Sequence, residues 1–90
     1  MATETVIQRV SVGPHIKAAR VVTSALENFE PDDIVFVKDG GTPTPGCVCV
    51  IQKPTMDLIL KRYQSAETLL DLPAGSAFVG VVYQLNKARF

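Results

Sequence analysis

The sequence has no tryptophan and few aromatic residues, which make up 7% of its 90 residues. Its hydrophobic interior must therefore be built mainly from valine, isoleucine, leucine and alanine. The chain also has no excess of one charge, because nine Lys and Arg residues balance nine Asp and Glu residues. A neutral chain has no long-range attraction to nucleic-acid phosphates or anionic lipid. It equally lacks the repulsion that keeps many small proteins apart, which favours association.

Features that would place the chain in or across a membrane are missing as well. No apolar run approaches the roughly 20 residues of a membrane-spanning helix. The N-terminal residues lack the basic flank and apolar stretch of a secretory signal peptide. Cys47 and Cys49 alternate in an apolar run, about 6.5–7 Å apart, which is too far for an unstrained disulfide. Free, buried thiols suit a reducing compartment, so we expect a cytoplasmic protein or a particle assembled in the cytoplasm.

The pattern of apolar residues predicts one domain over residues 1–90, in which strands and helices are mixed. Runs rich in β-branched residues predict four strands, Thr5–Val12, Ile34–Val37, Cys47–Ile51 and Ala77–Leu85. Apolar residues three and four positions apart predict two helices, His15–Phe29 and Thr55–Leu70. This β-α-β-β-α-β order predicts an α/β (α+β) fold of the ferredoxin-like type, a single four-stranded sheet with two helices on one face.

The predicted strands are apolar on both faces, although a sheet covered on one side should alternate between apolar and polar residues. Short central strands are sometimes simply apolar, but here the pattern recurs in three strands. An uncovered apolar face is typical of an interaction site, and a second copy is the commonest partner. The residues expected at this interface, on the sheet face and in the Thr/Pro loop, are Val48, Val50, Val79, Val81, Tyr83, Thr42, Pro43 and Thr44.

The single histidine, His15, lies at the start of the first predicted helix, in the segment Gly-Pro-His-Ile-Lys-Ala-Ala. Amides at a helix N-terminus stabilise anions, so His15 and Lys17 form a candidate anion or phosphate site. The segment resembles the phosphohistidine motif of the HPr phosphocarriers, Gly-x-His-x-Arg-Pro-Ala. That resemblance implies phosphate transfer through His15. The chain departs from the motif at Lys17 and Ala18, which stand in place of arginine and proline, and the alternative is an ordinary surface histidine.

Other chemistries find little support in the residues. Cys47 and Cys49 lack the further ligands that a metal site needs, and two small core residues are the simpler interpretation. The Gly-Gly-Thr-Pro-Thr-Pro-Gly loop lacks the Gly-Lys-Ser/Thr ending of a phosphate-binding loop. RNA-binding domains of this element order need aromatic residues on the first and third strands, and none is present there. We therefore predict no metal, no cofactor and no nucleic-acid or membrane partner.

These patterns predict a non-enzymatic structural or interaction subunit that self-associates into a homo-oligomer or a larger particle, such as a virus particle or shell. Shell proteins of bacterial microcompartments have a comparable element order, which is an analogy only. Two alternatives remain open. One is a regulatory module that encloses a small ligand between paired sheets, and the other is a phosphocarrier that acts through His15.

Overall fold

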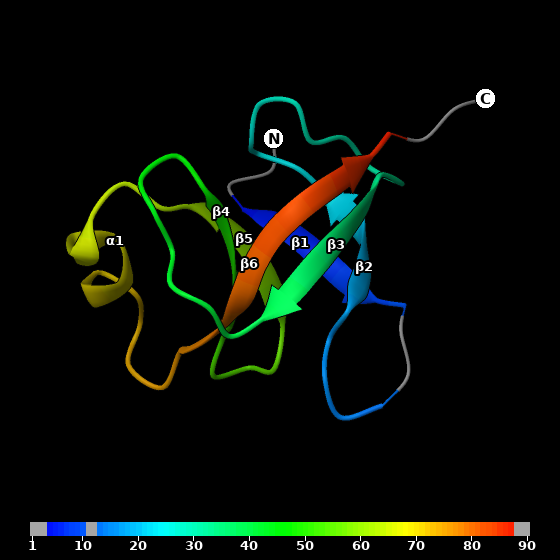
Figure 1. Ribbon diagram of the computed structural model, residues 1–90. Helices are drawn as coiled ribbons and strands as arrows, with labels where there is room; N and C mark the ends of the chain where they lie inside the picture. The colour runs from blue at the N-terminus through cyan, green and yellow to red at the C-terminus, as the bar shows by residue number, and fades with distance from the viewer. Residues whose placement is uncertain (1–3, 11–12, 88–90) are drawn as a thin grey trace.

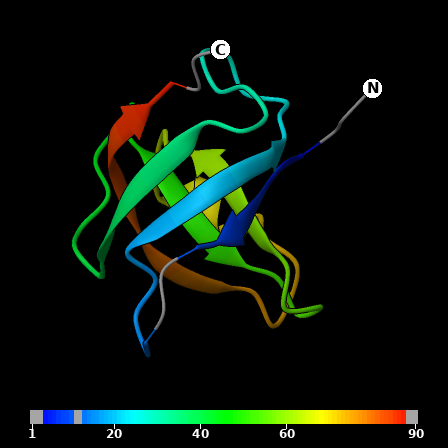
Figure 2. The same ribbon diagram turned by 90° about the vertical axis from the view of Figure 1, so that its right-hand side faces the viewer.

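The computed structural model describes residues 4–10 and 13–87 and shows a closed barrel of six antiparallel strands with a short helix outside it (Figures 1 and 2). The strands in chain order are β1 (Thr5–Arg9), β2 (Ala18–Thr23), β3 (Ile34–Asp39), β4 (Val48–Gln52), β5 (Leu58–Arg62) and β6 (Ala77–Asn86). The helix, α1 (Ala66–Leu70), lies between β5 and β6 in the chain. Around the barrel the order is β1-β2-β3-β6-β4-β5, and pairing of β5 with β1 closes the ring.

This barrel shows that the predicted ferredoxin-like sheet with two helices on one face is wrong. The four predicted strands correspond to β1, β3, β4 and β6, although residues 11–12 of the first one lie outside the described residues. Both predicted helices instead supply barrel strands. The error therefore lies in two segments, His15–Phe29 and Thr55–Leu70, whose apolar spacing suggests a helix.

The first of these segments contains strand β2. The buried residues there are two positions apart, since Ala19 and Val21 are both 0% exposed. Val22, which would lie on the buried face of a helix, is 39% exposed. A period of two is that of a strand, and the β-branched run that ends at Thr23 favours extended backbone. Phe29, at the end of the predicted helix, still reaches the core from the loop before β3.

The second segment begins with strand β5 and keeps only five helical residues, in α1. Met56 has a φ of 76°, in the left-handed region, where the chain turns between β4 and β5. The Lys53 amide donates a 2.8 Å hydrogen bond to the Asp57 carbonyl and closes this turn. The apolar run that follows then pairs with both β1 and β4, so tertiary pairing overrides a helical pattern.

Two hydrophobic clusters hold the fold together. The inner cluster draws buried residues from the strands around the ring, including the fully buried Val35 and Val50. The outer cluster lies on the opposite face of β4 and β5, where Cys49 and Ile51 are buried beside side chains of the segment around α1, such as Leu69. Strand β4 is therefore apolar on both faces because it contributes to both clusters.

This arrangement corrects the expectation of an uncovered sheet face around Val48 and Val50. These two residues are 7% and 0% exposed and belong to the inner cluster. The other face of β4 is covered by the chain itself, through Tyr63, Leu69 and Leu72. Apolarity on both faces of β4 thus results from barrel closure and from α1, and it does not mark a surface for a partner.

Strand β6 joins the two halves of the barrel, because it pairs with β3 on one side and β4 on the other. Its register shifts opposite Val50 and Ile51 and again opposite Phe36 and Val37, which leaves Val79 and Tyr83 as the extra residues. Such bulges redirect side chains and interrupt simple alternation along a strand. Sequence alternation alone therefore assigns the faces of β6 incorrectly.

A close approach between β6 and β3 requires the glycine at position 80. A Cβ atom built on Gly80 would lie 2.3 Å from the Lys38 carbonyl oxygen and 3.0 Å from Cγ1 of Val37. No side chain fits there without a shift of the β3 backbone.

Among the described residues, no helix is long and apolar enough to cross a membrane.

Candidate functional site

The outer surface of β2, β3 and β6 is the candidate functional surface. In Figure 1, β2 and β3 lie on the side of the barrel away from α1, with β6 beside β3. Figure 2 turns that side to the viewer and shows β2 and β3 in front, with no other described segment over them. The register places Ala18 opposite Phe36, and Lys38 opposite Val81. We define the open face by its apolar outward residues, Ala18, Ile34, Phe36, Val81 and Tyr83.

Two aromatic rings dominate the open face. The rings of Phe36 and Tyr83 have centroids 6.4 Å apart and planes tilted by 43°, an arrangement that aromatic pairs favour. Tyr83 is 64% exposed, because the register shift between β3 and β6 leaves it without a directly opposed residue. Phe36 and Val81 are partly buried. Exposed aromatic residues of this kind are enriched at protein interfaces.

A hollow of about 520 Å³ adjoins the open face where β3 ends. It is lined by His15, Lys17, Val37, Lys38, Asp39 and Tyr83. Nδ1 of His15 lies 2.8 Å from Oδ2 of Asp39, so the carboxylate is occupied by the imidazole. Two lysines face this one aspartate, which gives the lining a net positive charge. We call this feature the basic hollow, and its apolar part is the buried Val37 together with the Tyr83 ring.

The basic hollow joins residues that the sequence assigns to two separate sites, since His15 and Lys17 lie beside Tyr83. His15 is in the loop between β1 and β2 and not at a helix start. His15 therefore lacks the helix N-terminal amides that were expected to stabilise an anion beside it, and this expectation is wrong. The element order that supports the resemblance to HPr phosphocarriers is wrong as well.

At its opposite end the open face is bordered by paired charges. Nη1 of Arg20 donates to Oδ1 of Asp32 at 2.9 Å, and Nη2 of the same guanidinium donates to the Gln8 amide oxygen at 3.0 Å. Nearby, Nζ of Lys87 donates at 2.8 Å to Oδ2 of Asp33, a carboxylate that is only 1% exposed. These pairs position the loop before β3. The open face is thus bordered by a neutralised network at one end and by the basic hollow at the other.

The Thr/Pro loop lies apart from the open face. In Figure 1 it runs from the end of β3 toward the α1 side of the barrel, where the Gly46 amide donates to the Tyr63 carbonyl at 2.8 Å. Thr42 and Thr44 are exposed, and Pro43 is partly buried. The predicted interface residues are therefore divided among the barrel core, the open face and this loop.

The two cysteines are free and differ in environment. The Thr44 hydroxyl lies 2.9 Å from Sγ of Cys47, and this hydrogen bond, with a second one to the Thr44 backbone, lowers the pKa of the Cys47 thiol. Burial in the outer cluster raises the pKa of Cys49, and the neighbouring Cys47 raises it further. Cys47 is thus the more readily ionised of the two thiols.

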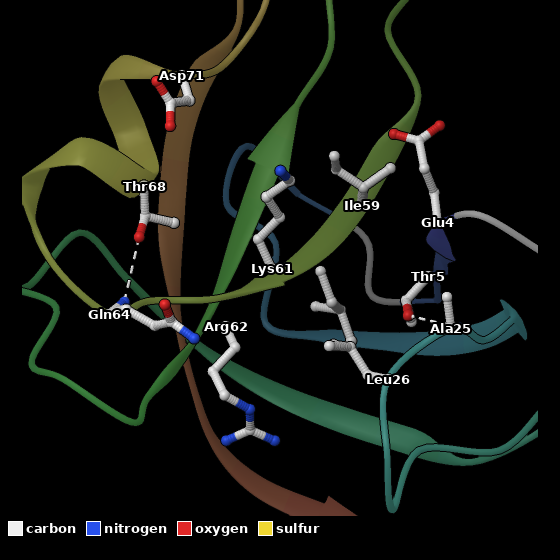
Figure 3. A pocket seen from close by; sticks show the side chains of 11 residues that line it. Glu4, Thr5, Ala25, Leu26, Ile59, Lys61, Arg62, Gln64, Thr68 and Asp71 are labelled. Carbon is white, nitrogen blue, oxygen red and sulfur yellow. Dashed lines mark hydrogen bonds between the residues drawn. The ribbon is translucent and has the colours of Figure 1, made fainter.

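A second cavity, of about 380 Å³, lies over β5 between α1 and the loop that follows β2 (Figure 3). In Figure 3 the Lys61 side chain points into it, with Thr68 and Asp71 on one side and Ile59 on the other. Arg62 also lines it and donates through Nη1 to the Gly46 carbonyl at 3.0 Å. Lys61 and Arg62 lie in the segment predicted as a helix over Thr55–Leu70, so no local sequence signal indicates the cavity, which depends on barrel closure.

Within residues 4–10 and 13–87, no group of three or more His, Cys, Asp or Glu side chains could hold a metal ion.

Comparison with known proteins found no matching family model, no matching curated protein and no matching solved structure. The class that the structure defines is a closed, six-stranded antiparallel β-barrel with a short external helix.

Proposed function

We propose that this protein is a non-enzymatic interaction subunit that self-associates through the open face into a homo-oligomer or a larger assembly. The observation that supports this most strongly is the exposure of Tyr83. It is 64% exposed beside Phe36 on the open face, which no described segment covers. Covering such a ring removes on the order of 100 Å² from water. At the usual transfer energies, this burial would stabilise a complex by about 2–3 kcal/mol.

A second copy of the chain is the partner that the charges favour. The nine basic and nine acidic residues leave no net charge, so two copies do not repel each other at long range. Most soluble oligomers are built from identical subunits. The free thiols of Cys47 and Cys49 support the cytoplasm as the compartment in which this assembly would form.

Sedimentation velocity over a range of protein concentrations tests this function. We expect the wild type to form oligomers at micromolar concentration and Tyr83→Ser to weaken self-association at least tenfold. Met56→Ser is the matched control, because Met56 is 71% exposed on the turn between β4 and β5. It should associate as the wild type does. A wild type that remains monomeric at every concentration, with its fold verified by circular dichroism, contradicts the proposal.

A second candidate function, the binding of a small molecule, is favoured by the cavity in Figure 3. The ammonium group of Lys61 points into this cavity and forms no hydrogen bond or ion pair with the described residues. Apolar side chains, Ile59 and Leu26, lie close to it in the lining. The lining also includes Asp71 and Glu4, and Glu4 is paired with Lys53. The unpaired Lys61 beside the apolar side chains is the group that would bind a small carboxylic acid with an apolar body.

Thermal stabilisation by hexanoate, compared with hexylamine, tests this second candidate. Hexanoate should raise the melting temperature of the wild type, and hexylamine should not. The Lys61→Met variant should lose the response, while Lys38→Met, which removes an exposed lysine outside this cavity, should retain it. Equal shifts with both probes would mean that the effect is only hydrophobic.

A further inference from the structure

We infer that copies of this protein join head to tail, with the α1 end of one copy inserted into the basic hollow of the next. The inference rests on the proposed self-association and specifies its geometry. It follows from two surfaces whose shapes and charges are complementary and which lie on different sides of one barrel.

The first surface is the acidic tip, which we define as Glu67, Leu70 and Asp71 of the α1 segment. Leu70 is 78% exposed, the highest exposure among the large hydrophobic residues that lie open to solvent in the described part of the chain. Residues three and four positions apart share one face of a helix, so Leu70 and Asp71 lie on the same side of α1 as Glu67. No basic residue occurs between residues 63 and 86, so the segment itself supplies no counter-charge, although Asp71 also lines the cavity that Lys61 enters.

The second surface is the basic hollow, which offers what the acidic tip lacks. Its apolar part, Val37 and the Tyr83 ring, lies in a space of about 520 Å³, ample for one leucine side chain. Lys17 and Lys38 line the hollow, and the exposed Lys38 is placed to meet a carboxylate that approaches it. An apolar centre with a rim of opposite charge is the usual composition of a specific protein interface.

The positions of the two surfaces decide which copy they can contact. Figure 1 shows α1 on one side of the barrel and β3, whose end borders the basic hollow, toward the other. One chain therefore cannot place its own tip in its own hollow. Each copy instead has one tip and one hollow, which are different surfaces, and such heterologous contacts build rings if the rotation closes and filaments if it does not.

A mixing experiment with two variants tests the head-to-tail arrangement. Lys38→Glu breaks the hollow and leaves the tip intact, whereas Leu70→Asp breaks the tip and leaves the hollow intact. Both side chains are exposed, so both variants should keep the wild-type circular dichroism spectrum. We expect each variant alone to be monomeric by native mass spectrometry. An equimolar mixture should form a 1:1 heterodimer and nothing larger, because it contains one intact tip and one intact hollow per pair.

Controls keep the result specific. Met56→Asp also places an acid on an exposed apolar position and should assemble like the wild type. If Lys38→Glu loses its fold, Lys38→Gln, which removes the charge without reversing it, takes its place. Raising the salt concentration should weaken the wild-type assembly, because the charged rim is exposed and therefore screened.

The outcomes separate this inference from the proposed function. If Leu70→Asp assembles as the wild type does, or if the mixed variants stay monomeric, the head-to-tail contact is wrong. If Tyr83→Ser is nevertheless monomeric, the proposed self-association through the open face is supported. Two open faces would then pair about a two-fold axis. A wild type that never assembles contradicts both proposals.

Discussion

Strands β3 and β4 begin with the same pattern, four consecutive apolar residues, and they meet different surroundings. In β4 the run Val48 to Ile51 is buried throughout, because the segment around α1 covers its outer face. In β3 the run Ile34 to Val37 is buried only at alternate residues, and its outer side chains Ile34 and Phe36 are partly exposed. We call these two regions the covered wall and the open wall.

The comparison shows that an apolar pattern on both faces of a strand requires a cover without specifying its source. In the covered wall the same chain supplies the cover, and the burial stabilises the fold. In the open wall no described segment does so, and the same apolar surface becomes available for association.

Replacement of Gly80, in the strand that joins the two walls, should have the largest effect. In Gly80→Ala the added Cβ would meet the Lys38 carbonyl oxygen at 2.3 Å, so β3 or β6 must move. We expect a loss of about 3 kcal/mol in the free energy of unfolding, measured with urea. Gly41→Ala is the control. Its φ of 83° is unfavourable for alanine, but its Cβ meets nothing within 4 Å, so a loss of only about 1–2 kcal/mol is expected.

A pair of isoleucine truncations compares the walls directly. Ile51 in the covered wall is 0% exposed, so Ile51→Ala should lower the free energy of unfolding by about 2–5 kcal/mol. Ile34 in the open wall is only partly buried, and Ile34→Ala should cost less than about 1 kcal/mol in dilute, monomeric protein. Equal losses would show that the open wall is covered after all.

The cysteines offer the mildest test, by chemical labelling. Cys49 lies in the covered wall and should react with iodoacetamide only when the barrel opens, whereas Cys47 should react in the folded protein. Because hydrogen bonds from Thr44 lower the pKa of Cys47, a larger thiolate fraction is present at a given pH than in an ordinary cysteine. Thr44→Val should raise that pKa and move the rate–pH profile of Cys47 toward higher pH. Labelling of Cys47 at neutral pH should then be a few-fold slower. An unchanged profile would contradict the role of Thr44.

Local sequence signals predict four of the six strands, because runs of β-branched residues rarely form anything else. They fail for β2 and β5, where the spacing of apolar residues also fits a helix. What decides between the two is pairing with distant strands, such as Val6 of β1 with Ile59 of β5, and no local pattern contains that information.

The candidate site, too, can be predicted from the sequence only in part. The sequence identifies Val81 and Tyr83 as surface residues of interest and singles out His15 and Lys17 for a different reason. It does not indicate that His15 and Tyr83 line one hollow, because the loop after β1 and the last strand meet only when the ring closes. The bulge at Tyr83 is equally invisible, since it arises from the register of β3 against β6.

Pairing of β5 with β1 has a further consequence for how copies could assemble. Because the ring of described strands is closed, none of its edges offers free backbone amides and carbonyls to another chain. The proposed assembly would therefore form through side chains and not by strand addition. Assembly of this type can be adjusted residue by residue without unfolding the subunit, and it avoids the nearly irreversible stacking of open sheets into fibrils.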